Sequence, residues 1–273
     1  MIGKLLILAA LAGAPQTDST LFARLDSMVV AYTEALRSAD TETKYREADF
    51  MISSCKDSLA RQRVALKLYG TYLNSPVMGE EAVAVHLFDT WFAPGKVQMK
   101  SETDLLNARI YSDFNRATLI GMDAPVLNLE NLEGGIERLP AEGKVSVLYF
   151  YDSSCSNCTA QTLLLPYVLD EADFEMDFYA VYAGSDRETW RKYVGEHFGF
   201  SNPRIRVHHL WDPEVESDYQ RLYGVLATPK MYLVEPQGTI LGRRLTAESL
   251  LQLLPYAGAV SKLYERYSSG SGE

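Results

Sequence analysis

The sequence has only three cysteines, no long apolar run and no basic run, and each shortage excludes a class of protein. Three cysteines in 273 residues are too few for a small scaffold stapled by disulfides. The apolar stretch 5–12 is too short to cross a membrane. A formal net charge of -10 without clustered Lys or Arg argues against general binding to nucleic acid or anionic membranes. With 47% hydrophobic and 23% charged residues, the chain has the composition of an ordinary globular protein and room for two domains.

The N-terminus has the layout of a secretory signal. Lys4 precedes the apolar stretch, and the small residues Gly13 and Ala14 follow it. We therefore expect residues 1–14 to be a signal-like segment and the protein to be exported, in the periplasm or elsewhere in the cell envelope. A truncated N-terminus is the alternative. At the other end, residues 268–273 are small and polar, which predicts a flexible tail.

The first half of the chain reads as helices. Its apolar residues recur at three- and four-residue steps, which places them on one helical face. The pattern predicts an all-helical domain over residues 15–120. The helices expected in it cover 21–36, 59–70, 80–88 and 101–114.

From Gly121 the pattern changes to short apolar runs that alternate with helical stretches. The run 144–151 is apolar or aromatic almost throughout, as in a central strand buried on both faces. This alternation predicts an α/β sandwich around a mixed sheet over residues 121–267. The other expected strands cover 174–182, 207–211 and a hairpin at 230–245, and the expected helices cover 155–169, 186–198, 218–223 and 247–254.

One motif carries redox chemistry. Cys155 and Cys158 are three residues apart and follow the predicted strand at the start of a predicted helix. The first turn of a helix offers free N–H groups and partial positive charge, and both stabilise a thiolate. This placement predicts that Cys155 is the exposed, attacking thiolate, and that Cys158 lies one turn inside and resolves the mixed disulfide.

A second motif lies downstream, where Thr228-Pro229 directly precedes the apolar run 230–234. A proline there costs the sheet a hydrogen bond, and a cis X–Pro bond in a tight turn is a natural solution. Cys-x-x-Cys after a strand, followed later by such a proline, resembles the thioredoxin superfamily. The segment 121–129 is similar to the TlpA/ResA-like branch and to peroxiredoxins.

The resemblance implies a thiol–disulfide oxidoreductase acting on protein disulfides, in which Thr228 and Pro229 contact the substrate backbone. It implies no cofactor and no metal, and a membrane thiol reductase as electron donor. In its helices and in the stretch 74–81, the helical half resembles a domain of unknown function found ahead of such modules in bacterial envelope proteins. A different class of function stays open: the helical domain binds a partner or peptide, and the thioredoxin-like part is a scaffold.

Several residues depart from the thioredoxin pattern. Ser154 stands where thioredoxins have Trp, and Ser156-Asn157 stands in place of Gly-Pro. Tyr149 occupies the position of a buried carboxylate, and Leu163 that of a helix proline. The reduction potential, the thiol acidity and the substrate preference are therefore open.

The remaining alternatives concern single residues. The cysteine pair could be a stable disulfide, two inert thiols, a peroxidase site or part of a metal site, but a peroxidatic Thr is missing three residues before Cys155, where Asp152 stands. Asp152 either raises the pKa of Cys155 or is a loop residue in solvent. Cys55 is expected to be a small buried residue, with a redox role as the alternative. His208 and His209 are expected to be ordinary strand residues on opposite faces rather than metal ligands, with a catalytic role as the alternative.

Overall fold

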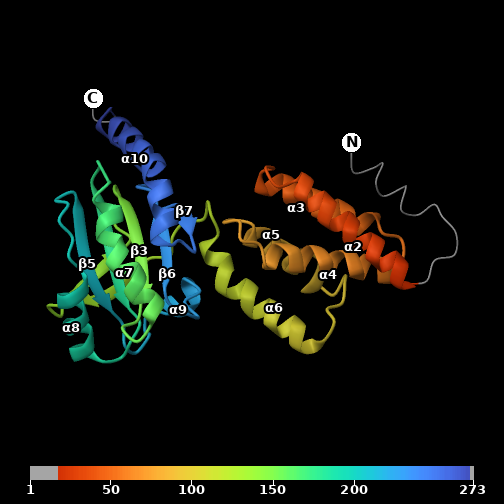
Figure 1. Ribbon diagram of the computed structural model, residues 1–273, viewed down its shortest axis with the longest axis horizontal. Helices are drawn as coiled ribbons and strands as arrows, with labels where there is room; N and C mark the ends of the chain where they lie inside the picture. The colour runs from red at the N-terminus through yellow and green to blue at the C-terminus, as the bar shows by residue number, and fades with distance from the viewer. Residues whose placement is uncertain (1–17, 271–273) are drawn as a thin grey trace. The chain divides into compact units, whose positions relative to one another are not determined.

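The computed structural model describes residues 18–270 (Figure 1). The signal-like segment 1–14 lies outside the described residues. The chain divides into two compact units, one ending at Arg116 and the other beginning at Ala117. Among the helices of the described residues, none has the length and apolar character needed to cross a membrane.

The first unit is all-helical, and each helix predicted for this part of the chain is present. Its apolar core is formed by side chains such as Val29, Ile52, Val64 and Leu68, each less than 2% exposed. The elements of this unit are α2 (Asp18–Ala35), α3 (Thr41–Ser54), α4 (Ser58–Leu73), α5 (Glu81–Leu87), the π-helix η1 (Phe88–Phe92) and α6 (Glu102–Asn115).

Helix α3 is absent from the prediction because its buried face is not uniformly apolar. Lys44 lies on that face and is buried, and its ammonium group pairs with Glu80 at 2.7 Å. The start of the helix does carry a sequence signal that the apolar pattern misses. Asp40 accepts a hydrogen bond from the Thr43 N–H, as an N-cap residue does.

The second unit is built on a mixed seven-stranded sheet in the order β2-β1-β5-β4-β3-β6-β7. Strands β3, β4 and β5 run parallel, and the other pairings are antiparallel. The predicted α/β sandwich with a mixed sheet is confirmed. The strands are β1 (Leu127–Asn131), β2 (Ile136–Leu139), β3 (Val145–Tyr151), β4 (Met176–Tyr182), β5 (Ile205–Trp211), β6 (Lys230–Val234) and β7 (Ile240–Arg243).

Two apolar layers sandwich this sheet. One layer joins α7, α8 and α10 to side chains such as Tyr149 and Phe178, and the other joins α9 to side chains such as Phe150 and Tyr179. Strand β3 is buried along its whole length, as its composition predicts. The helices are α7 (Ser156–Leu169), α8 (Arg187–His197), α9 (Tyr219–Leu222) and α10 (Ala247–Gly270).

Helix α10 is much longer than the predicted 247–254. Pro255 indicates a helix end in the sequence, because a proline inside a helix removes a backbone hydrogen bond. The structure continues through it, and Leu254 and Ala257 on either side are both buried in the core. Residues 268–270, expected in a flexible tail, form the end of this helix.

Candidate functional site

The two cysteines lie where a buried strand passes into a helix. Strand β3 ends at Tyr151, and Cys155 is the N-cap residue of α7. Cys155 is partly exposed, whereas Cys158, one turn inside the helix, is fully buried. Both are free thiols in the structure. This is the difference in exposure that the sequence predicts for an attacking and a resolving cysteine.

The sulfur of Cys155 has polar neighbours on two sides. Its Sγ accepts a hydrogen bond from the Cys158 N–H at 3.1 Å and lies 3.4 Å from the Thr228 carbonyl oxygen. Partial burial opposes ionisation, but hydrogen bonds from Cys158 outweigh it and lower the pKa of Cys155 below its ordinary value. The helix terminus therefore favours the thiolate at this position.

Cys158, in contrast, is held as a protonated thiol. Its side chain belongs to the apolar layer beneath α7. Burial, with a smaller contribution from Cys155, raises the pKa of Cys158 to about 11. The first thiol is thus the acidic member of the pair, and the second stays protonated at neutral pH.

Sheet pairing brings the Thr228-Pro229 segment to the sulfurs. Strand β6 runs antiparallel to β3, and Lys230 at the start of β6 pairs with Phe150 near the end of β3. The residues just before β6 therefore lie beside those just after β3. The Thr228–Pro229 bond is cis, as the sequence predicts.

A chain of buried hydroxyl groups lies beneath the first turn of α7. Tyr149 donates a hydrogen bond to the Cys158 carbonyl oxygen at 2.9 Å and contacts the Thr162 hydroxyl at 3.1 Å. Tyr193 donates to the same Thr162 oxygen at 3.3 Å. Burial raises the pKa of Tyr149 far above its ordinary value, so this hydroxyl stays protonated and acts as a donor. Tyr149 thus holds the backbone at Cys158 through this hydrogen bond.

The Asp152 carboxylate is engaged in a local turn. Its Oδ1 accepts hydrogen bonds from the Ser154 N–H at 2.7 Å and from the Ser154 hydroxyl at 2.6 Å. These contacts shape the loop between β3 and α7. They fit the interpretation of Asp152 as a loop residue.

The third cysteine belongs to the first unit. Cys55 is half-buried at the end of α3, and its thiol donates to the Met51 carbonyl oxygen at 3.4 Å. Burial raises the pKa of Cys55. A protonated, half-buried thiol fits the expected role as a small apolar residue.

The two adjacent histidines have different surroundings. His209 lies edge-on against Phe198, and burial lowers its pKa to about 4, so it is neutral at pH 7. His208 stacks on Tyr179 and contacts two carboxylates, which the sequence analysis did not predict. Within residues 18–270, no group of three His, Cys, Asp or Glu side chains is placed to hold a metal ion.

The comparisons with known proteins identify the fold. No protein-family model matches the chain, and no curated protein matches it significantly. A thioredoxin-like protein from Bacteroides caccae superposes with a TM-score of 0.64 at 16% identity, over 85% of this chain and 83% of the other. The chain therefore has a thioredoxin-like fold, as its motifs predict.

Other solved structures match about half of the chain. The thioredoxin domain of a thiol-disulfide oxidoreductase from Bacteroides vulgatus has 22% identity over 50% of this chain and 96% of its own, with a TM-score of 0.45. A putative thiol:disulfide interchange protein from Chlorobium tepidum has 21% identity over 51% and 98%, with a TM-score of 0.42.

Proposed function

We propose that this protein is a thiol–disulfide oxidoreductase that acts on protein disulfides through Cys155 and Cys158. One observation carries the proposal: the Cys155 sulfur lies at the start of α7, bonded to the Cys158 N–H and 3.4 Å from the Thr228 carbonyl. A partly exposed thiolate beside a buried second thiol is the arrangement that disulfide exchange requires.

The exchange proceeds in two displacements. The Cys155 thiolate attacks one sulfur of a client disulfide, a mixed disulfide forms, and the second client sulfur leaves as a thiolate that takes up a proton. Cys158 then loses its proton and attacks the Cys155 sulfur, which releases the first client sulfur as a thiolate that takes up the proton lost by Cys158. The client gains two electrons and two protons, one of them from solvent because Cys155 starts as a thiolate, and Cys155 and Cys158 end as a disulfide. The reverse direction oxidises a client dithiol by the same steps.

The segment around Pro229 has a binding role in this proposal. The Thr228 carbonyl oxygen lies 3.4 Å from the Cys155 sulfur. Thr228 and Pro229 would therefore contact an extended client peptide. An exported protein in the bacterial envelope needs a dithiol donor to reset the pair, and a membrane thiol reductase fits that role.

A second candidate function concerns the helical unit. A cavity of about 430 Å³ lies between α4 and α6, and its lining combines apolar and aromatic side chains with Lys100 and Asp104. This observation favours a partner-binding or peptide-binding role, with the thioredoxin-like unit as a scaffold. The lining includes Leu66, Tyr69, Leu73, Met99, Lys100, Asp104 and Tyr111.

The decisive experiment compares the native protein with two cysteine variants in an insulin-reduction assay with dithiothreitol as the donor. Cys155→Ser should reduce exchange to the uncatalysed rate, because it removes the attacking thiolate. Cys55→Ser should match the native protein and serves as the control.

The Cys158→Ser variant identifies the substrate. It should accumulate mixed disulfides through Cys155, and mass spectrometry of the trapped species would identify the client. No exchange by the native protein, or equal exchange by Cys155→Ser, would refute the enzyme and leave the binding function.

A further inference from the structure

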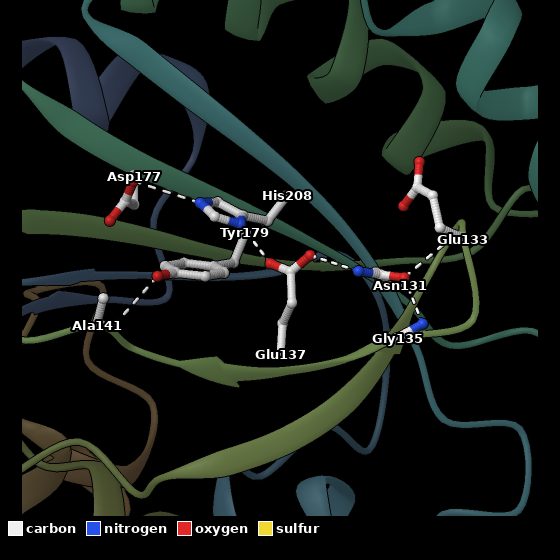
Figure 2. A network of polar contacts seen from close by, with 8 residues as sticks. All are labelled: Asn131, Glu133, Gly135, Glu137, Ala141, Asp177, Tyr179 and His208. Carbon is white, nitrogen blue, oxygen red and sulfur yellow. Dashed lines mark hydrogen bonds and ion pairs between the residues drawn. The ribbon is translucent and has the colours of Figure 1, made fainter.

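A histidine between two carboxylates lies on the sheet face opposite the cysteine pair. His208 on β5 has its Nδ1 atom 2.6 Å from the Glu137 carboxylate and its Nε2 atom 3.3 Å from the Asp177 carboxylate (Figure 2). The side chains of His208 and Asp177 are 9% and 6% exposed, whereas Glu137 is 31% exposed. The three residues come from β5, β4 and β2, so the contact joins three strands.

These contacts favour a charged ring. A carboxylate only accepts hydrogen bonds, and both ring nitrogens donate only when histidine is an imidazolium. A neutral His208 would point a nitrogen lone pair at one of the two carboxylates. With the proton present, one positive charge lies between two negative charges in a largely dry site, where such contacts are strong.

Other aromatic, charged and polar groups surround the ring and its two carboxylates. On β4, Tyr179 stacks on His208 with ring centres 4.5 Å apart. On β5, Arg206 helps to lower the pKa of Glu137 and so keeps this carboxylate ionised, while its own positive charge opposes that of the ring. His209 carries little charge at neutral pH and points to the other face. In the β1–β2 hairpin, Asn131 donates to the second Glu137 oxygen at 2.7 Å.

We propose that Glu137, Asp177 and His208 form a pH-sensitive latch, which fastens the β1–β2 hairpin to the central sheet while His208 is protonated. Asp177 and His208 belong to strands in the middle of the sheet, and Glu137 belongs to the edge strand β2. Loss of the His208 proton leaves two carboxylates without the cation between them, and the hairpin then opens more often.

The short strand pairing makes the hairpin sensitive to this loss. Strand β1 pairs with β5 through two residue pairs, whereas β4 pairs with β5 through seven. Buried Leu127, Leu129 and Leu139 hold the hairpin at every pH. The latch therefore changes how often the hairpin opens and does not detach it.

The pH window follows from two shifts. Burial lowers the pKa of His208, but the hydrogen bonds to Asp177 and Glu137 outweigh it and raise the pKa above 6.5. Stability from His208 is thus complete below 6.5 and is lost as the pH rises through its folded pKa. Burial raises the pKa of Glu137, but hydrogen bonds from Asn131 and His208 lower it below 4.5, so its contribution is lost in acid.

Hydrogen exchange read by mass spectrometry tests the latch in the full chain, with correction for the intrinsic rate at each pH. The opening equilibrium of 127–139 should rise about tenfold between about pH 6 and about pH 9. The β6–β7 hairpin at the other edge of the sheet, 230–243, is the internal control and should stay constant. His208→Gln should open the hairpin at every pH and abolish the pH dependence, whereas His197→Gln should retain it.

A proton NMR titration of the His208 ring gives a second readout. Its midpoint should lie above 6.5, and Asp177→Asn should lower it, because one of the two carboxylates is removed. A midpoint at or below 6.5, or equal opening of 127–139 at both pH values, would overturn the proposal. Both measurements remain decisive if His208→Gln fails to fold.

Discussion

The cysteine pair and the latch hold ionised groups in the same unit by different physical means. The Cys155 sulfur is partly exposed at a helix terminus, where a backbone N–H supports its charge. The His208 ring is buried on the other face of the sheet, where two carboxylate side chains support its charge. Backbone donors come with the helix wherever it starts, whereas the carboxylates must be placed by other strands.

The difference in exposure fits the two roles. A sulfur that attacks a client must be reached from solvent, so part of its surface has to stay free of protein contacts. A charge that fastens strands together needs no access and gains strength from burial, provided that each polar group is paired. The cysteine site is thus accessible to a client, whereas the histidine site is buried and joins strands.

Within the cysteine pair, alkylation should separate the two thiols. Cys155 has a pKa below its ordinary value, whereas the pKa of Cys158 is raised to about 11. The lower intrinsic nucleophilicity of an acidic thiol offsets part of this difference. At neutral pH, iodoacetamide should label Cys155 at least about tenfold faster than Cys158, as measured by peptide mass spectrometry.

The reduced native protein is the sample, and the Cys158→Ser variant checks the rate for Cys155 alone. Equal labelling of both cysteines would mean that the helix terminus does not favour the first thiolate. The contrast between exposed and buried thiols would then fail.

The buried hydroxyl groups below α7 provide a test of how the backbone at the cysteine site is held. Tyr149→Phe removes the donor to the Cys158 carbonyl, and it should lower the free energy of unfolding by about 1 kcal/mol. Denaturant unfolding measures the loss. Tyr167→Phe is the matched control, because Tyr167 is 75% exposed and should give no change. An equal effect of both variants would show that the buried hydroxyl does not hold the first turn.

The smallest expected effect on stability concerns an exposed ion pair of the β1–β2 hairpin. Arg187 pairs with Glu130 at 2.6 Å, and the two side chains are 41% and 32% exposed. Because solvent screens such pairs, Glu130→Gln should cost less than about 1 kcal/mol. Thermal unfolding should show the same small loss of stability at neutral and at mildly alkaline pH. A large or strongly pH-dependent loss would assign to this pair the role given to the latch.

The sequence predicts the cysteine site because its parts are local or adjacent to recognisable breaks. Cys155 and Cys158 are three residues apart, and Thr228-Pro229 directly precedes an apolar strand. Only the pairing of β3 with β6 is needed to bring the two segments together. The roles assigned to these four residues remain predictions, and the exchange assay tests them.

The latch gives no comparable signal. Glu137, Asp177 and His208 are separated by 40 and 31 residues, and each has the appearance of an ordinary strand residue. Their contact depends on the strand order, which places β1 between β2 and β5. Helix α3 was missed for a related reason, since buried Lys44 is satisfied by Glu80 from a distant segment. Polar groups that pair between distant segments cannot be predicted from the spacing of apolar residues.

The most direct test of the proposed chemistry is a redox titration of the native protein in glutathione buffers, followed by acid trapping and mass spectrometry. We predict one two-electron transition that yields a disulfide between Cys155 and Cys158, with Cys55 still a thiol. Absence of that disulfide at every glutathione ratio, or a Cys155 that forms only mixed disulfides with glutathione, would contradict the account.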